Sequence, residues 1–193
     1  VDGAASLDIG RIHYQRWVYV GSTSADIAAA YGDTPVRANL KPRGRAWFVG
    51  AGGPMGRMHV QRAIEFSEPP AIIVCTDISD MRLNELCDSF ATQARVKGIN
   101  FICYNPANEA DHATKKLAFD HAGFDDIVML VPVPAVITEA AGHLARDGVM
   151  NVFAGVARGT MVALDMSGTY LKNTRVIGHS ASKMSDFELV LEK

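Results

Sequence analysis

The sequence has few cysteines, little net charge and no long apolar run. Its 193 residues carry a formal net charge of −2, which gives no electrostatic reason to expect binding to nucleic acid or to an anionic membrane surface. No apolar run approaches the roughly 20 residues that a membrane-spanning helix needs. The first residues, Val1-Asp2-Gly3, include neither an initiator Met nor the basic and apolar regions of a signal peptide. We therefore expect a cytoplasmic protein, and a chain that is a processed product or a piece of a longer one.

The three cysteines, Cys75, Cys87 and Cys103, are spaced too widely for a zinc knuckle or a C-x-x-C redox pair. Cys75 and Cys103 fall in expected strands and Cys87 in an apolar helical stripe, so all three are interpreted as structural thiols in a reducing compartment. The histidines show no ligand spacing such as H-E-x-x-H. We expect no metal site in this chain.

What the sequence does contain is a glycine-rich segment directly after an apolar run. Residues 46–50 are typical of a buried strand, residues 50–56 (Gly-Ala-Gly-Gly-Pro-Met-Gly) of a tight turn, and residues 57–66 of a helix. Glycine tolerates positive φ and lets an anion approach the backbone, and a helix N-terminus offers free N–H groups and a favourable dipole. This segment predicts a phosphate-binding turn.

Two registers relate this turn to the G-x-G-x-x-G fingerprint of dinucleotide-binding folds. Counting from Gly50 puts Met55 in the place of the third glycine, whereas counting back from Gly56 gives Gly53 and then Ala51. We prefer the second register, with Gly50 as the last residue of the strand. The alternative is a turn that binds nothing. Asp77 argues against that alternative, because it ends the next apolar run, where a dinucleotide fold places the carboxylate that binds the adenosine ribose.

Apolar runs alternate with helical patterns along the rest of the chain. Strands are expected at 46–50, 71–75, 99–103, 127–131, 149–154 and 175–177, and helices at 57–66, 108–122, 135–145 and 186–192. A further helix bears residues 83–90, is capped by Ser79 or Asp80 and ends at Gly98. This alternation predicts an α/β Rossmann fold over residues 41–193, a doubly wound parallel sheet of six strands in the order 3-2-1-4-5-6, with ligands at the carboxyl ends of the strands. The loops at those ends, residues 50–56, 77–78, 132–134 and 154–156, are the expected site. The candidate cofactor-binding residues on or beside these loops are Gly50, Ala51, Gly53, Pro54, Met55, Gly56, Asp77, Arg82, Val131, Pro132, Ala154 and Gly155.

Other charged residues near these loops have simpler interpretations. Arg57 and His59 could approach a pyrophosphate, but as members of a helix they are better explained as surface residues. Arg82 could reach the ribose or could be a surface charge, and both remain open. Asp125 and Asp126 are interpreted as the entrance to a strand.

Residues 1–40 are expected to form an arm, with a strand at 17–20 and a helix at 26–31. Leu7–Gly21 aligns without a gap to Leu164–Gly178, with three identities in fifteen positions. Chance and duplication are both open, and a duplication would make residues 1–31 the tail of a preceding Rossmann-like unit. Because an exposed apolar edge strand is a liability, we expect residues 17–20 to pair with the 175–177 strand or with its equivalent on a second copy.

The motifs resemble those of the medium-chain dehydrogenase/reductase superfamily. The resemblance covers residues 41 to about 190 and is carried by segments 49–56, 75–77, 102–106, 125–131, 148–155 and 175–178. Two segments are most similar in sequence to zinc-type polyol and sugar-phosphate dehydrogenases such as the sorbose-1-phosphate reductase group. They are residues 53–62, Gly-Pro-Met-Gly-Arg-Met-His-Val-Gln-Arg, and residues 151–155, Asn-Val-Phe-Ala-Gly.

The resemblance implies a nicotinamide-cofactor-binding domain within an oxidoreductase that moves hydride between the cofactor and an alcohol or ketone. NAD is expected in preference to NADP, because a 2′-phosphate on the ribose would meet the like charge of Asp77. In that superfamily a separate domain supplies the catalytic zinc ligands, and its Cys and His pattern is absent from this sequence. The chain alone is therefore expected to be inactive, and a polyol or sugar-phosphate substrate would be bound through the other domain. Homo-oligomers joined edge to edge through their sheets are also implied. The alternatives are an S-adenosylmethionine-binding methyltransferase and a noncatalytic NAD-binding module.

Overall fold

The computed structural model describes residues 4–15, 17–21, 24–26, 28, 37, 39–108, 123–178, 184, 188 and 191. Its strands are β1 (Ala5–Asp8), β2 (Arg45–Val49), β3 (Ile72–Thr76), β4 (Asn100–Tyr104), β5 (Phe124–Met129), β6 (Leu144–Val152), β7 (Met161–Leu164) and β8 (Arg175–Gly178). Its helices are α1 (Ile9–Gln15), α2 (Pro54–Glu65), α3 (Asp80–Val96), α5 (Pro134–Gly142) and α6 (Ser167–Leu171).

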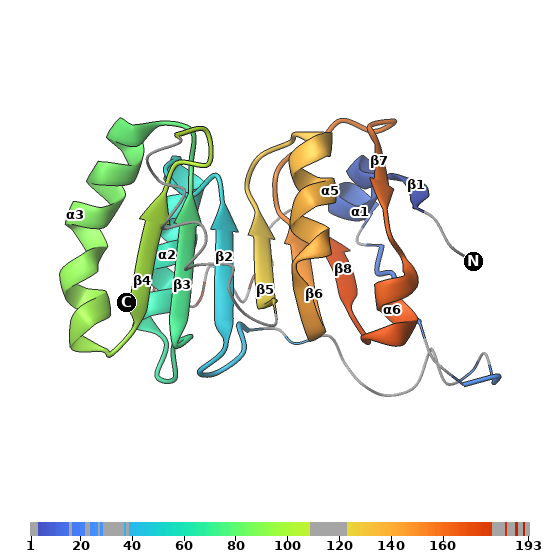
Figure 1. Ribbon diagram of the computed structural model, residues 1–193, viewed down its shortest axis with the longest axis horizontal. Coiled ribbons are helices and arrows are strands. Elements are labelled where there is room, and N and C mark those ends of the chain that lie inside the picture. The colour runs from blue at the N-terminus through green and yellow to red at the C-terminus, as the bar shows by residue number, and fades with distance from the viewer. Residues whose placement is uncertain are drawn as a thin grey trace.

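Six of the strands form one parallel sheet in the order β4-β3-β2-β5-β6-β8 (Figure 1). This is the predicted 3-2-1-4-5-6 order of a Rossmann fold, which the structure confirms. The two faces of the sheet are buried in separate cores, because successive residues of a strand point to opposite faces. Ala46 and Phe48 join the core under α2 and α3, whereas Trp47 and Val49 join the core that holds residues of α1 and α5. Because all six strands are parallel, their carboxyl ends, where this fold class binds ligands, lie along one edge of the sheet.

Two helix boundaries differ from the sequence-based expectation. Helix α2 begins at Pro54 rather than at residue 57, because proline at the first helical position needs no hydrogen-bond acceptor. Helix α5 ends at Gly142, and the chain enters β6 at Leu144 instead of at residue 149. At the early start of β6, Leu144 pairs with Phe124 of β5. The register between β5 and β6 then shifts, so that the next pair is Asp126 with Val149. The helices expected at 26–31, 108–122 and 186–192 fall mostly outside the described residues.

The arm contains elements that the sequence did not predict. Strand β1 pairs antiparallel with β7 in a separate two-stranded sheet, and helix α1 follows it directly. The expected strand at 17–20 is present as a single antiparallel bridge between Tyr19 and Val176 of β8. The arm therefore lies beside the β8 edge of the main sheet (Figure 1).

A charged cluster fixes the chain at the amino ends of β2 and β5. The guanidinium of Arg37 donates to Asp126 Oδ1 at 2.8 Å and to the carbonyl of Asp125 at 2.9 Å. The backbone N–H of Lys41 donates to Asp126 Oδ2 at 2.8 Å, and that of Arg45 to Asp125 Oδ2 at 2.9 Å. Burial raises the pKa of Asp126 although its hydrogen bond to Lys41 and the charge of Arg37 oppose the shift. The two aspartates thus anchor the entrance to β5, as their position suggested.

This cluster predicts a contrast between two substitutions. Because burial disfavours the Asp126 carboxylate more than its partners favour it, Asp126→Asn is expected to change the free energy of unfolding by no more than about 1 kcal/mol at pH 7. Arg37→Ala leaves the carboxylate without its cation and is expected to cost about 2 kcal/mol, below the range for fully buried pairs because the Arg37 side chain is 29% exposed. Urea unfolding of both variants measures the difference.

The pH dependence of the same variants has a definite sign. A carboxyl group with a raised pKa in the folded state contributes stability that is fully present below the ordinary pKa of about 4 and is lost as pH rises through the folded-state value. Wild type is therefore expected to gain stability relative to Asp126→Asn as pH falls from 7 toward 4. A loss of relative stability over that interval would show that the ion pair outweighs burial.

Candidate functional site

The glycine-rich turn is tied to the end of the neighbouring strand. Strand β2 ends at Val49, so Gly50 is the first residue of the turn. The expectation that Gly50 is the last residue of the strand is therefore wrong. Gly50 has a φ of +83°, which an L side chain rarely adopts. The backbone N–H groups of Gly50 and Ala51 both donate to the carbonyl of Thr76, at 2.8 and 2.9 Å. The turn therefore crosses over the end of β3.

The other glycines of the turn divide into packed and open positions. A Cβ on Gly56 would lie 2.4 Å from the carbonyl oxygen of Ala51 and 2.6 Å from its Cα, so glycine is needed for α2 to approach the strand. A Cβ on Gly53 would meet no protein atom within 4 Å. In the G-x-G-x-x-G fingerprint the third glycine allows helix and strand to pack, and the second lets the backbone approach pyrophosphate. The register that counts back from Gly56 accounts for both observations.

Asp77 connects the end of β3 to this turn. Its Oδ2 accepts a hydrogen bond from the backbone N–H of Gly52 at 3.0 Å, and its Oδ1 accepts one from the N–H of Ser79 at 3.0 Å. A Cβ on Gly52 would lie 2.9 Å from Asp77 Oδ2 and 2.6 Å from the Cβ of Arg82. The carboxylate is thus held in one orientation, with acceptor capacity remaining on both oxygens. Gly52 was not among the candidates, although its place inside the turn was visible.

A cavity of about 140 Å³ opens beside Asp77 at the carboxyl ends of β2, β3 and β5. It brings together three of the candidates, Gly50, Asp77 and Val131. Ile78 and Val133, which belong to the expected site loops at 77–78 and 132–134, also line it, whereas sequence reasoning missed Val49, Thr76, Pro106 and Val136. Apolar side chains dominate the lining, and ligand sites characteristically combine such walls with a few fixed polar groups.

The remaining candidates surround this centre less closely. Pro54 and Met55 form the exposed first turn of α2, whereas Ala51 is fully buried and can offer a ligand only its backbone. Ala154 is buried after β6, and its N–H donates to the carbonyl of Met129 at 2.8 Å. Pro132 and Gly155 are exposed on the loops that follow β5 and β6. None of these six residues lines the 140 Å³ cavity.

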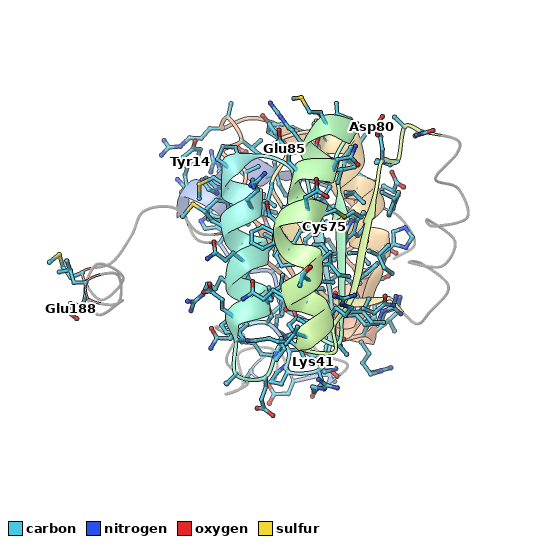
Figure 2. All side chains as sticks on the ribbon, turned by 90° about the vertical axis from the view of Figure 1, so that its left-hand side faces the viewer. Tyr14, Lys41, Cys75, Asp80, Glu85 and Glu188 are labelled. Carbon is cyan, nitrogen blue, oxygen red and sulfur yellow. The ribbon has the colours of Figure 1, made fainter. Side chains whose placement is uncertain are left out.

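Arg57 and His59 point away from the turn. Arg57 donates to Ser89 Oγ at 2.9 Å and pairs with Glu85 at 3.4 Å, so it joins α2 to α3. Figure 2 shows these two helices side by side, with Glu85 on α3. The ring of His59 contacts Phe153 edge-on, with 4.5 Å between centroids, and burial lowers its pKa. Neither side chain is arranged to hold an anion at the start of α2.

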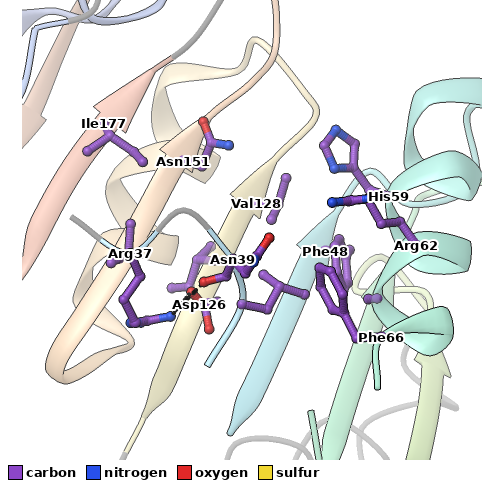
Figure 3. Close-up of a pocket in the computed structure, with 14 residues that line it drawn as sticks. Arg37, Asn39, Phe48, His59, Arg62, Phe66, Asp126, Val128, Asn151 and Ile177 are labelled. Atoms are coloured by element: carbon purple, nitrogen blue, oxygen red, sulfur yellow. Dashed lines mark hydrogen bonds and ion pairs between the residues drawn. The ribbon is translucent and has the colours of Figure 1, made fainter. Parts of the chain in front are cut away.

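A larger cavity, of about 210 Å³, lies on the face of the sheet beside α2 (Figure 3). His59 and Arg62 of α2 lie on one side of it and Asn151 of β6 on the other, and the Arg37–Asp126 ion pair lies at its margin. Its strand residues, such as Val128, come from the middle of strands and not from their ends, and no candidate cofactor residue lines it. Of these two cavities the smaller one is the candidate site, because it adjoins the glycine turn and Asp77 and the larger one does not.

The three cysteines lie together between α3 and the sheet. Cys75 and Cys103 are neighbours in the register of β3 and β4, and all three thiols are free. Hydrogen bonds between the thiols, with burial, raise the pKa of Cys87 and of Cys103 above the ordinary thiol value. Among the described residues no group of three or more His, Cys, Asp or Glu side chains could hold a metal ion. Within the same part of the chain, no helix has the length and apolar character to cross a membrane.

Part of the chain is similar in sequence to known proteins. No protein-family model matches the chain. It is 32% identical over 79% of its length to the uncharacterized protein YggP of Escherichia coli, covering 36% of that protein. It is 29% identical over 70% of its length to L-sorbose 1-phosphate reductase of Klebsiella pneumoniae, covering 32%, and 29% identical over 79% to mannitol-1-phosphate 5-dehydrogenase of Aliivibrio fischeri, covering 37%. The chain thus spans about a third of the length of these relatives.

Solved structures share the fold at low identity. They include 2R,3R-butanediol dehydrogenase of Bacillus subtilis (TM-score 0.61, 16% identity, 80% of this chain and 40% of that one) and a short chain alcohol dehydrogenase of Escherichia coli complexed with NADH (0.59, 16%, 79% and 41%). A zinc-binding dehydrogenase of Sinorhizobium meliloti bound to NADP is also similar (0.56, 15%, 72% and 38%). These relatives and neighbours confirm the resemblance, drawn first from the motifs, to zinc-type alcohol and polyol dehydrogenases of the medium-chain superfamily.

Proposed function

We propose that this chain binds a nicotinamide dinucleotide along the carboxyl edge of its sheet, as the cofactor-binding part of an alcohol, polyol or sugar-phosphate dehydrogenase. The observation that supports this most is the hydrogen bond from Gly52 N–H to Asp77 Oδ2. It fixes the carboxylate that would bind a ribose against the turn that would bind a pyrophosphate, and a dinucleotide fold uses these two groups together.

The described residues fit the parts of such a cofactor. The pyrophosphate would approach Gly53, where no protein atom occupies the space of a Cβ, and the first turn of α2, whose N–H groups have no acceptors within the helix. The ribose hydroxyls would donate to Asp77. The apolar lining that includes Ile78, Pro106 and Val133 suits the flat faces of adenine. The loops at Val131–Pro132 and Ala154–Gly155 are left for the nicotinamide half.

The bound cofactor would supply a hydride acceptor or donor, and the chain's own residues would hold and orient it. Substrate activation is assigned to a part of the protein outside this chain, because the described residues contain no zinc-binding group and the matched segment covers only about a third of each curated relative. The relatives named for sorbose and mannitol phosphates support a polyol or sugar-phosphate substrate. Free thiols, which persist in reducing compartments, support a cytoplasmic location.

Calorimetric titration separates this proposal from its alternatives. NAD and NADP are expected to bind at one site per chain, whereas S-adenosylmethionine gives no heat of binding. The relatives and structures reported above that are named by an activity are a reductase and dehydrogenases. Binding of S-adenosylmethionine without binding of either dinucleotide would contradict the proposal.

Catalytic silence of the isolated chain is a separate expectation. With saturating NAD and a panel of polyols and sugar phosphates, no absorbance change at the NADH wavelength is expected, because no group of the described residues could hold the metal ion that would polarise the alcohol oxygen. Measurable turnover by the purified chain would show that it carries its own electrophile.

A further inference from the structure

The arm contacts the edge of the Rossmann sheet through two antiparallel pairings. In the first, β1 runs against β7 with Ser6 opposite Ala163 at the centre of the register. In the second, Tyr19 lies opposite Val176 of β8, and its N–H donates to the carbonyl of Val176 at 3.2 Å. These pairings lie on either side of helix α1 along the arm.

Both pairings are centred on residues that the internal repeat makes equivalent. The repeat relates residues 157 positions apart, as from Leu7 to Leu164. The same separation relates Ser6 to Ala163 and Tyr19 to Val176, so each of these two residues pairs with its own counterpart. The pairs on either side follow the same relation. Ala5 lies opposite Leu164, and replacing each of these residues by its counterpart gives the pair of Val162 and Leu7, which is also observed. Such pairing is what a local two-fold axis produces.

The glycines of the two repeats show the same exchange. A Cβ on Gly178 would lie 2.6 Å from the carbonyl oxygen of Ile12, so β8 packs closely on the backbone of α1. A Cβ on Gly21 would lie 2.8 Å from Thr169 Oγ1 and 2.9 Å from the backbone of Tyr170, so the arm packs closely on α6. Gly21 is the counterpart of Gly178, and Ile12 is the counterpart of Thr169. Reciprocal contacts of this kind define an isologous interface.

The order of elements also agrees between the copies. The strand β1, the helix α1 and the bridged residue Tyr19 match the strand β7, the helix α6 and the strand β8. Shifted by the repeat, α6 falls at positions 10–14, inside α1. Three identities in fifteen positions did not decide between chance and duplication, but shared register, shared contacts and shared element order favour duplication.

We propose that the β7–α6–β8 unit is a self-complementary docking surface whose partner is a second copy of the same unit, and that the arm is that copy within this chain. The interface is therefore an internal counterpart of a two-fold dimer contact. Because the arm already pairs with β8, the edge is closed to another chain, and the intact protein does not dimerise through it. This inference does not depend on cofactor binding.

Disulfide trapping in the full chain tests the proposal. A cysteine at position 163 meets itself only when two β7 strands pair across a two-fold axis, and Ala163 is exposed. Ala163→Cys with the arm intact is expected to stay monomeric under mild oxidation. The same substitution combined with Ser6→Pro, Tyr19→Pro and Gly21→Val, which puts a proline into each of the two pairings and blocks packing on α6, is expected to give at least tenfold more covalent dimer.

Met161→Cys in the same released chain is the matched control. Met161 is also exposed, but in a symmetric dimer it would lie opposite the counterpart of Asp8, which is Asp165, and so would link poorly. Covalent dimer from Ala163→Cys with the arm intact would overturn the proposal. A folded released chain that gives no more dimer at position 163 than at position 161 would overturn it too.

A second variant decides the matter if the released chain does not fold. Residues 7–21 are replaced by the sequence of residues 164–178, and a control chain carries a scrambled version of that insert. Ser6→Cys and Ala163→Cys are added to both chains and to a chain that is otherwise wild type. The replaced chain is expected to form the internal disulfide in the same yield as the otherwise wild-type chain, and the scrambled chain to form at least tenfold less of it. Equal yields from the replaced and scrambled chains would show that the two segments are not equivalent.

Discussion

Gly56→Ala is expected to lower the free energy of unfolding by about 1–3 kcal/mol and to weaken NAD binding by at least tenfold. The new methyl group would lie 2.4 Å from the carbonyl oxygen of Ala51 and 2.6 Å from its Cα. Both are backbone atoms, so no side-chain rotation relieves the clash and α2 must move away from β2. Since α2 carries the proposed pyrophosphate site at its first turn, the same movement misplaces the N–H groups there.

Gly53→Ala is the matched partner of this substitution. A Cβ at this position meets no protein atom, so the free energy of unfolding is expected to stay within about 0.5 kcal/mol of wild type. Binding is expected to fall by about 10- to 100-fold, because the methyl group takes the space through which a phosphate reaches the backbone and displaces a charge-assisted hydrogen bond. Urea unfolding and calorimetry on both variants measure the contrast. Unchanged NAD affinity in Gly53→Ala would place the pyrophosphate elsewhere.

Wild type is expected to bind NAD several hundredfold more tightly than NADP. A 2′-phosphate beside Asp77 would bring like charges to about 4 Å, which costs up to about 4 kcal/mol at an effective dielectric near 20 before screening by salt. The carboxylate cannot easily turn aside, because Gly52 and Ser79 hold its two oxygens. Arg82, whose Cβ adjoins the turn, can soften the preference if its guanidinium reaches the phosphate.

Asp77→Asn tests the origin of this preference. The amide keeps one acceptor for the Gly52 or Ser79 N–H but removes the charge, so the ratio of NADP to NAD dissociation constants is expected to fall toward one. Asp88→Asn, an exposed change of the same charge on α3, is the control and is expected to leave the ratio unaltered. If the ratio survives Asp77→Asn, another group discriminates against the 2′-phosphate.

The sheet order was predictable because apolar runs and helical patterns alternate, and the Rossmann topology is then nearly determined. Boundaries that depend on partners were not. Strand β6 begins at Leu144 because that residue pairs with Phe124, twenty positions away in the sequence, and no local pattern reports this. Strand β1 has four residues and α1 seven, and both are stabilised by contacts with residues more than a hundred positions later. Local propensity is too weak to indicate elements of that length.

The candidate site was predictable where the backbone itself sets the requirement. Gly50, Gly56 and Asp77 were recognisable because positive φ, close packing and a strand-end carboxylate each demand a residue type. Pro106 and Val136 were missed because they line the cavity as apolar side chains from separate elements, and many residues could do so. The grouping of three distant cysteines was missed for a similar reason: the register of β3 and β4 brings Cys75 beside Cys103.

Backbone NMR of the ¹⁵N-labelled chain during titration with NAD tests the central claim most directly, because it locates the ligand. The account predicts concentration-dependent shifts of the amide signals of Gly50, Gly52, Gly53 and Met55, together with Asp77, Ile78 and Val131 beside the 140 Å³ cavity. Signals of Phe48, Val128 and Asn151, which line the larger cavity on the sheet face, should stay in place. Shifts confined to that second group, or no shifts at millimolar NAD, would contradict the account.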